Sequence, residues 1–582
     1  MTKRIALLPL IVAFGLPVLL YLQTLGFGFT WFDDDAIILK NVPFLSDVRN
    51  APKVFLDDAF LLGGSHSAGA SQSSSIAGIF YRPLQTLSFM ADVLLSGGSN
   101  PWMFHLTNTL LLGLITCLLF LFFRTFSIPS NVSLLSALLY SIHPLFTSSV
   151  AWIPARGDLL LLCSALSSFL FFAKYLRERT VGCLLLHWLT FTVALFCKET
   201  AAFLPFIFIL YYFTFAPREP LAKRHLLVLA LYGISGIFWY GLRSMAIGRA
   251  PDQGGVDWMQ MISNLRTIPE SLARFILPFN IAPIPRFTLF ATLAGFGIML
   301  VIIVLFFANK ERSGKEKMFC LSWFLLLLLP AIVYKNEYYD YLNHRFFLPL
   351  IGIMLFLLFL IPKKLMEAND TRLTRLMVAA VVVLSSATAV VCQAYADPLT
   401  FYNSVISHDP DNALMCNNRG NVRLSLGDFG GAIGDFTRAI ELNPSLTVAY
   451  YNRGNAYGAK GDVAEAIKDY GRVLELNPQN ADACLNRGNA YDQMGEHQKA
   501  IRDFDKSIEL IPSNIYGYNS RGIAYAEMGQ YQKAIADFNR AIELNPVFAE
   551  AYINRGATYR AGNMLAEAEQ DFSTYKKLTE KK

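Results

Sequence analysis

The most restrictive feature of this 582-residue chain is a 34-residue period in its last third. Five arginines and five prolines each recur at this spacing: Arg419, Arg453, Arg487, Arg521 and Arg555, and Pro410, Pro444, Pro478, Pro512 and Pro546. A period this strict predicts a stack of helix pairs. Such a stack presents a long concave surface that suits the binding of another chain.

Other positions recur when each unit is numbered so that its closing proline is position 32. The first helix of each unit carries a glycine, at Gly420, Gly454, Gly488, Gly522 and Gly556. The second carries an alanine and, four residues later, an aromatic residue: Ala432 and Phe436, Ala466 and Tyr470, Ala500 and Phe504, Ala534 and Phe538, Ala568 and Phe572. Small residues allow the helices to approach and the rings fill the remaining space. This is the tetratricopeptide pattern, and it predicts five repeats over residues 413–582.

Three asparagines, Asn421, Asn455 and Asn489, recur in the first helices of these units, on the face that such arrays turn towards their groove. An amide both donates and accepts hydrogen bonds, so these side chains could pair with the backbone of an extended peptide. The alternative is that they make structural contacts within the array.

The first four hundred residues are typical of a membrane protein. Apolar residues make up 54% of the chain and charged residues 16%, and the excess lies before the polar repeats. About twenty apolar residues span a bilayer as helix. Eleven candidate spans occur, at approximately 5–25, 104–123, 131–145, 159–173, 181–197, 201–215, 226–245, 287–308, 318–334, 346–361 and 376–395. The net charge of +6 is small and does not indicate a nucleic-acid partner.

The predicted fold class is therefore all-α, with a bundle of about eleven spans in residues 1–395, a linker at 396–412 and an α-solenoid at 413–582. Alternate short loops collect Lys and Arg, as cytoplasmic loops do: Arg124; Lys174, Arg177 and Arg179; Arg218, Lys223 and Arg224; Lys310, Arg312, Lys315 and Lys317; Lys363, Lys364, Arg372 and Arg375. An odd number of spans then puts the first long loop, 26–103, and the repeats on the outer face. That face is the periplasm for a bacterial inner membrane, or the lumen for an endoplasmic reticulum membrane.

Three consecutive carboxylates, Asp33, Asp34 and Asp35, follow the first span. Crowded carboxylates raise one another's pKa, and they suit either a general base or a bound cation. Asp33 and Asp34 are therefore also a candidate site for a divalent cation. The alternative is a solvated start of the loop that helps the span to stop.

A second group of polar side chains is costly to place near a bilayer, and all fall on the predicted outer side: Arg82, His143, Arg156, Asp158, Lys198, Glu199, Arg243 and Arg345. A single charge at a helix end usually reaches water and is structural. Here, however, cations gather beside carboxylates at one face of the membrane. In such a site Arg and Lys could hold the phosphate of a lipid, and a carboxylate could activate the hydroxyl of an acceptor. The sequence contains no phosphate-binding loop and no dinucleotide glycine fingerprint.

At these motifs the sequence resembles membrane glycosyltransferases with tetratricopeptide repeats, which belong to the GT-C superfamily and include the animal transmembrane O-mannosyltransferases. The resemblance rests on motifs in order along the chain: Phe29-Thr-Trp-Phe-Asp-Asp-Asp, Tyr81-Arg-Pro-Leu, Asn100-Pro-Trp, His143-Pro, Arg156-Gly-Asp, Lys198-Glu and Asn343-His-Arg. One departure concerns His143-Pro, which relatives continue with a second His and a Glu. This chain has Phe146 and Ser148 there.

The resemblance implies an enzyme that transfers a sugar from a polyprenyl-phosphate donor to an acceptor, expected to be a protein hydroxyl, at the outer or lumenal face. Asp33 or Asp34 would be the general base and would invert the anomeric centre. Asp35 and the second group of polar side chains would bind the donor, and the repeats would recruit the acceptor or a partner protein. The alternative is a non-catalytic membrane scaffold that assembles other proteins through its repeats. A transporter fits poorly, because the charges gather at one face.

Overall fold

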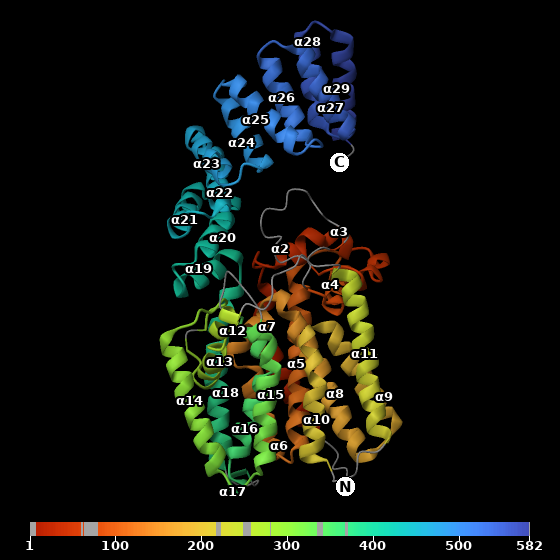
Figure 1. Ribbon diagram of the computed structural model, residues 1–582, viewed down its shortest axis with the longest axis vertical. Coiled ribbons are helices and arrows are strands. Elements are labelled where there is room, and N and C mark those ends of the chain that lie inside the picture. Colours follow the sequence, from red (N-terminus) through yellow and green to blue (C-terminus); the bar gives the residue numbers. More distant parts are fainter. Residues whose placement is uncertain are drawn as a thin grey trace. The chain divides into compact units, whose positions relative to one another are not determined.

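The computed structural model describes residues 7–59, 62, 80–216, 223–247, 258–279, 281–333, 342–366 and 371–580 (Figure 1). Every regular element in these ranges is a helix, which confirms the all-α prediction. The chain divides into two compact units, of which the first ends at Pro410 and the second begins at Asp411.

The first unit is a bundle of long apolar helices with shorter helices at one end. Its α-helices are α1 (Leu7–Tyr21), α2 (Asp34–Ile37), α3 (Val42–Leu45), α4 (Pro83–Ser96), α5 (Pro101–Thr125), α6 (Ser130–Ser141), α7 (Thr147–Ala151), α8 (Arg156–Glu178), α9 (Val181–Cys197), α10 (Leu204–Phe215), α11 (Lys223–Ile247), α12 (Trp258–Asn264), α13 (Thr267–Ile276), α14 (Leu289–Ala308), α15 (Gly314–Val333), α16 (Leu350–Leu360), α17 (Lys363–Met366), α18 (Thr371–Cys392) and α19 (Pro398–His408). In Figure 1, α2, α3 and α4 lie at the end of this bundle opposite to α17.

Seven segments in the described ranges are long and apolar enough to cross a membrane: Leu7–Gly26, Pro101–Thr125, Ile153–Glu178, Leu226–Ile247, Leu289–Ala308, Gly314–Val333 and Thr371–Tyr395. An eighth is a pair bent by 48°, and three apolar helices are shorter: Val181–Cys197, Glu199–Phe215 and Leu350–Leu360. Helices thus occur at all eleven predicted places, and the protein is a multi-pass membrane protein. The number that cross the bilayer stays a prediction.

The ends of α1 and α18 lie side by side. The backbone N–H of Gly28 donates to the carbonyl of Ala396 at 2.8 Å, and the amide of Gln393 donates to the side-chain oxygen of Gln23 at 2.8 Å. Both helices therefore run towards the same end of the bundle. If α1 and α18 both cross the membrane, the chain crosses it an odd number of times between the start of α1 and the end of α18.

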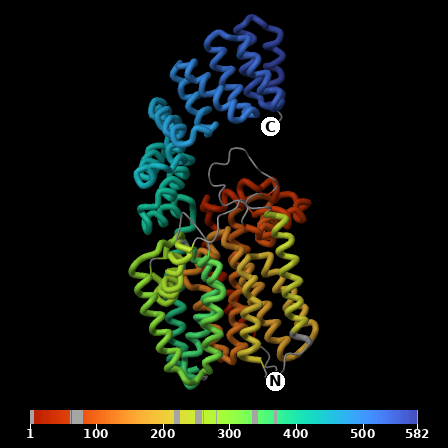
Figure 2. Tube along the Cα trace, viewed as in Figure 1, coloured from red at the N-terminus to blue at the C-terminus, as the bar shows by residue number. Residues whose placement is uncertain are grey.

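The second unit consists of five helix pairs that stack in chain order (Figure 2). The pairs are α20 (Ala413–Ser425) with α21 (Phe429–Leu442), α22 (Thr447–Lys460) with α23 (Val463–Leu476), α24 (Ala481–Gln493) with α25 (His497–Leu510), α26 (Ile515–Glu527) with α27 (Tyr531–Leu544), and α28 (Ala549–Ala561) with α29 (Leu565–Thr579).

The recurring glycines allow the two helices of each pair to approach closely, as their spacing predicts. A Cβ atom added to Gly420 would lie 2.6 Å from the ring of Phe436, and one added to Gly488 would lie 2.5 Å from the ring of Phe504. Both distances are shorter than van der Waals contact. The same glycine and aromatic pair recurs in the other three repeats.

The recurring arginines are held by a buried aspartate of the same repeat. Arg487 donates from Nε and Nη2 to the two carboxylate oxygens of Asp503, at 2.7 and 2.8 Å. The equivalent bidentate pairs are Arg419 with Asp435, Arg453 with Asp469, Arg521 with Asp537, and Arg555 with Asp571. Because each pair joins the two helices of a repeat, the arginine period reflects a structural ion pair and not a ligand site.

Candidate active site

Asp33 and Asp34 lie at the start of α2, and they differ in burial and in hydrogen bonding. Thr30 donates from its backbone N–H, at 2.8 Å, and from its hydroxyl, at 2.6 Å, to one oxygen of Asp34. The Asp34 side chain is buried, whereas Asp33, the N-cap residue of α2, is half-buried. Asp33 is therefore the more accessible of the two, and Asp34 is held by the loop itself.

Both carboxyls bind their protons more tightly than usual. Burial, followed by the negative charge of Asp34, raises the pKa of Asp33 to about 7, while Arg82 and Arg345 act in the opposite direction. Burial also raises the pKa of Asp34 to about 6, against the hydrogen bonds from Thr30. Asp33 can therefore exchange a proton near neutral pH, and it lies within electrostatic reach of two cations.

Asp35 faces away from this arrangement. It forms an ion pair with Lys40 at 2.6 Å, and its side chain is 44% exposed. It does not line the cavity described below. The contact of Asp35 with the donor therefore stays a prediction that this cavity does not support.

A cavity of about 190 Å³ in the first unit is lined by six of the other predicted residues. Its charged lining comes from segments far apart in the chain: Arg82, Asp158, Lys198, Glu199, Arg243 and Arg345. Its apolar lining comes mainly from α8, α15 and the residues before α16: Phe80, Leu161, Leu327, Pro330, Ala331, Leu348 and Pro349. The cavity thus combines a cationic part with an apolar part.

Lys198 is fixed at this cavity by Asp158. Its ammonium lies 2.6 and 2.7 Å from the two carboxylate oxygens. Burial, more than the neighbouring charges, lowers the pKa of Lys198, and the carboxylate of Asp158 opposes that shift. The pair therefore presents a positioned cation that remains partly balanced by an anion.

Arg82, Glu199 and Arg243 keep polar atoms available. Arg82 lies 3.9 Å from Glu199 and stacks on the ring of Phe80 at 4.6 Å. Nε of Arg82, Oε1 of Glu199 and Nε of Arg243 are buried and have no hydrogen-bond partner within the described residues. Buried polar atoms without partners are costly, so a ligand that satisfies them would gain binding energy.

Arg156 does not line the cavity, and its role in holding the donor stays a prediction. Its side chain is fully buried and lies 2.5 Å from Asp92. It also donates to Asn108 at 2.7 Å and to the carbonyl of Phe104 at 2.8 Å. Sequence reasoning missed Asp92, although a lone acid in the largely apolar segment Pro83–Ser96 predicts a buried partner.

His143 also makes contacts within the protein, and its role in binding the donor stays a prediction. One ring nitrogen lies 3.0 Å from the carbonyl of Phe275, and the other accepts from the backbone N–H of Leu145 at 3.2 Å. The two residues that depart from the family pattern, Phe146 and Ser148, are buried and do not line the cavity. Phe146 instead stacks on Phe347, with ring centroids 4.6 Å apart.

His344 is a residue that sequence reasoning did not select, although it precedes Arg345 in the Asn343-His-Arg motif. Its Nε2 lies 3.8 Å from Asp158, and its ring packs against Trp152 at 5.4 Å. Burial, and then the positive charges of Lys198, Arg345 and Arg82, lowers its pKa well below the usual value. His344 is therefore a neutral neighbour of the Lys198–Asp158 pair.

One feature of Asp34 is compatible with the predicted divalent-cation site at Asp33 and Asp34. Over the described ranges, no group of three or more His, Cys, Asp or Glu side chains is arranged to hold a metal ion. Oδ1 of Asp34 is buried and accepts no hydrogen bond from these residues.

In the array, the three predicted groove residues differ from one another. Asn455 accepts from the Tyr470 hydroxyl at 2.8 Å and from the Asn486 amide at 3.1 Å, so it makes structural contacts. Asn421 and Asn489 are exposed. The three asparagines therefore do not form one uniform row of unpaired amides.

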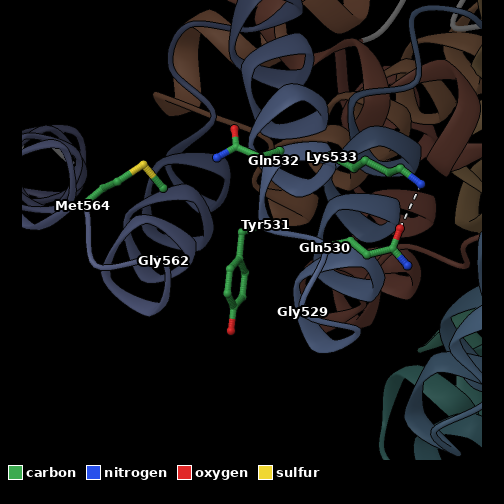
Figure 3. Close-up of a pocket in the computed structure, with 7 residues that line it drawn as sticks. All are labelled: Gly529, Gln530, Tyr531, Gln532, Lys533, Gly562 and Met564. Atoms are coloured by element: carbon green, nitrogen blue, oxygen red, sulfur yellow. Dashed lines mark hydrogen bonds between the residues drawn. The ribbon is translucent and has the colours of Figure 1, made fainter.

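The array also carries an open hollow of about 360 Å³ near the turns that precede α27 and α29 (Figure 3). It is lined by Gly529, Gln530, Tyr531, Gln532, Lys533, Gly562 and Met564. Lys533 donates to Gln530 at 2.9 Å, as the dashed line in Figure 3 marks. None of the three predicted asparagines lines this hollow.

Comparison with known proteins supports both halves of this description. Residues 86–240 match the dolichyl-phosphate-mannose-protein mannosyltransferase family. Residues 420–461, 447–480, 481–514 and 515–548 match tetratricopeptide repeats. The chain is similar to membrane mannosyltransferases. This similarity supports glycosyltransferase activity, and its range includes Asp158 and Lys198 but not Asp33 or Arg345.

The chain is also similar in sequence to proteins named as protein O-mannosyl-transferases. The chain is 34% identical over 194 residues to protein O-mannosyl-transferase Tmtc1 of Drosophila melanogaster, covering 32% of this chain and 20% of that protein. It is 34% identical over 151 residues to protein O-mannosyl-transferase TMTC4 of Homo sapiens, covering 22% of this chain and 20% of that protein. The match thus spans about a fifth of each relative's length. A crystal structure of MamA aligns with this chain at 27% identity and a TM-score of 0.27. The alignment covers 28% of this chain and 95% of the MamA chain.

Proposed function

We propose that the protein transfers a sugar, with mannose as the first candidate, from a polyprenyl-phosphate donor to a hydroxyl of a protein acceptor. One observation carries the proposal: a cavity with four cations and an apolar side lies within electrostatic reach of Asp33, whose raised pKa suits a general base. The similarity to mannosyltransferases supports the same reaction class.

The cavity suits the two chemical parts of the donor. Arg82, Lys198, Arg243 and Arg345 would hold the phosphate, since arginine and lysine are the usual partners of phosphate oxygens. The apolar residues of α8 and α15 would contact the first prenyl units. Asp158 would orient Lys198 and would not contact the phosphate.

Asp33 is the proposed base, and Asp34 supports it. Asp33 would take the proton of the acceptor hydroxyl while the hydroxyl oxygen bonds to the anomeric carbon. The bond from that carbon to the phosphate oxygen breaks, and the electron pair leaves with the polyprenyl phosphate. Attack from the opposite side inverts the anomeric centre, and the cations stabilise the leaving phosphate.

Asp33 and Asp34 are also the proposed ligands of a divalent cation, if one is used. Carboxylate oxygens suit Mg²⁺ and Mn²⁺, and the buried Oδ1 of Asp34 has no hydrogen-bond donor in the described residues. When bound, such an ion would supply positive charge to the site.

The proposed place of reaction is the outer or lumenal face. The loop with Asp33 lies beside the end of α18, as the Gly28–Ala396 hydrogen bond shows. The short helix α17, with Lys363 and Lys364, lies at the opposite end of the bundle, and basic short loops favour the cytoplasm (Figure 1). These observations support an outward active site. The array, which follows α19, would then recruit the acceptor or a partner protein on the same side.

Replacing Arg345 with methionine tests the donor site. The variant removes one cavity cation while keeping an unbranched side chain, so the KM for polyprenyl-phosphate mannose is expected to rise about tenfold or more. Transfer to Ser- and Thr-containing peptides by the purified full-length protein gives the measurement. Arg49→Met is the matched control, because the Arg49 side chain is 87% exposed and forms an ion pair with nearby Asp47. An unchanged KM for Arg345→Met would contradict the assignment.

The pH profile tests the base. A general base works only when deprotonated, so kcat/KM is expected to rise as the pH increases through about 7, the pKa of Asp33. At higher pH, Lys198 loses its proton through its lowered pKa, and donor binding should weaken. Lys198→Arg should remove this alkaline decline, because arginine does not titrate there.

The same titration tests for a cation. If a divalent ion binds Asp33, chelation with EDTA should raise the pH midpoint of the acidic limb, since a bound cation favours the carboxylate. A midpoint near 4 with EDTA present would contradict the base assignment.

A further inference from the structure

Helix α19 packs directly on the turn that carries the acidic pair, within the first unit. The hydroxyl of Tyr402 donates to the carbonyl of Trp31 at 3.1 Å. The neighbouring Phe401 contacts Phe32, with ring centroids 6.0 Å apart. Tyr402 is only 1% exposed, so its hydroxyl is held where it meets this carbonyl. An element from the end of the unit therefore supports a loop from its beginning.

The supported residue has an unusual backbone. Trp31 adopts a φ of 56°, in the left-handed region that residues other than glycine rarely enter. Such a conformation persists only where its surroundings stabilise it. The turn lies between two contacts that do so, the Tyr402 hydroxyl on the Trp31 carbonyl and the Thr30 hydrogen bonds to Asp34. The left-handed residue directs the chain into α2 two residues before Asp33.

We propose that Tyr402 is a positioning residue for the acidic pair: its hydroxyl holds Trp31 in the left-handed conformation and thereby sets the orientation of Asp33 and Asp34. The catalytic consequence rests on the proposed function, whereas the structural claim does not. Residues 409–412 alone join α19 to α20. The repeat array thus follows a helix that contacts the turn before Asp33.

Tyr402→Phe tests the catalytic consequence. It keeps the buried ring and removes one hydrogen bond, so kcat is expected to fall roughly tenfold while the KM for polyprenyl-phosphate mannose changes less than about twofold. Tyr232→Phe is the control, because it removes the hydrogen bond between another buried tyrosine and His187 in the bundle. An unchanged kcat per folded molecule would overturn the proposal.

A pair of substitutions at Trp31 separates the backbone from the lost ring. In the Tyr402→Phe background, Trp31→Gly should restore much of kcat, since glycine enters the left-handed region without cost. Trp31→Ala removes the same indole but keeps the Cβ, so it should not restore activity. Equal activity of the two double variants would overturn the backbone explanation.

Hydrogen exchange tests the structural claim without any transfer assay. The backbone N–H groups of Ile37 and Ile38 donate to the carbonyls of Asp33 and Asp34, each at 3.0 Å. Tyr402→Phe should speed exchange of the peptide covering residues 30–38 and leave residues 104–123 unchanged. Unchanged exchange in 30–38 would refute positioning. Full transfer by Asp33→Asn would instead refute the proposed base, and the exchange result would still decide the role of Tyr402.

Discussion

Replacing Asp33 with asparagine is expected to lower kcat by about 10²- to 10⁴-fold, the range that a general base contributes. Asparagine has the same size but cannot accept the acceptor's proton. Donor binding should change little, because the cations that contact the phosphate remain. Single-turnover transfer from polyprenyl-phosphate mannose to a Ser- and Thr-containing peptide, measured with purified full-length protein, gives the rate of the chemical step.

Asp35→Asn is the matched control. Asp35 lies two residues after Asp33, and its ion pair with Lys40 is on the surface. Its rate should stay within about twofold of the parent rate. Glycan transfer that is unchanged when Asp33 and Asp34 are both replaced by asparagine would contradict an enzymatic role for this site. That outcome would favour the non-catalytic scaffold.

The second large effect is expected in the repeats. Replacing Asp503 with asparagine leaves Arg487 without its bidentate carboxylate partner, between the two helices of the third repeat. Losing one member of a largely buried ion pair is expected to lower the free energy of unfolding of the array by about 2–4 kcal/mol. Because repeats contact mainly their neighbours, the loss should be greatest around α24 and α25. Urea unfolding of the full-length protein in detergent, followed by hydrogen exchange over residues 411–580, gives the measurement.

Asp505→Asn is the control on the same helix. The Asp505 side chain is 50% exposed, and its partner Arg521 also binds Asp537. An exposed ion pair contributes about 0–1 kcal/mol, so this variant should be close to the parent. Equal losses for both variants would show that the arginine period does not reflect the buried pairs. Transfer activity of either variant on a free peptide should be unchanged.

Several features of the protein could be predicted from the sequence because they depend on local spacing. The glycine and aromatic positions of the repeats predicted which side chains pack together, and the structure confirms that a Cβ at Gly488 would overlap Phe504. A helical repeat fixes the neighbours of each residue through its period. Apolar runs predicted helices in the same way, since a bilayer requires every backbone polar group to be bonded within the segment.

The composition of the candidate site depended on tertiary structure. Arg156 and Lys198 look alike in the sequence, yet Arg156 is neutralised by Asp92 away from the cavity while Lys198 lines it beside Asp158. Asp33, Asp34 and Asp35 are consecutive, yet a surface lysine pairs with the third and Thr30 holds the second. Nothing in the spacing of residues indicated that Tyr402 meets Trp31, 371 positions earlier.

One physical reason explains why some features could be predicted from the sequence and others could not. The sequence by itself determined the helices, the repeats and the kinds of charge present, because periodicity and hydropathy act over short stretches of chain. Only the tertiary structure decided which charge is neutralised, which is buried and which faces a cavity. A group's pKa and its free hydrogen-bonding atoms depend on neighbours brought together by folding, and many of those neighbours come from segments tens to hundreds of residues apart in the sequence.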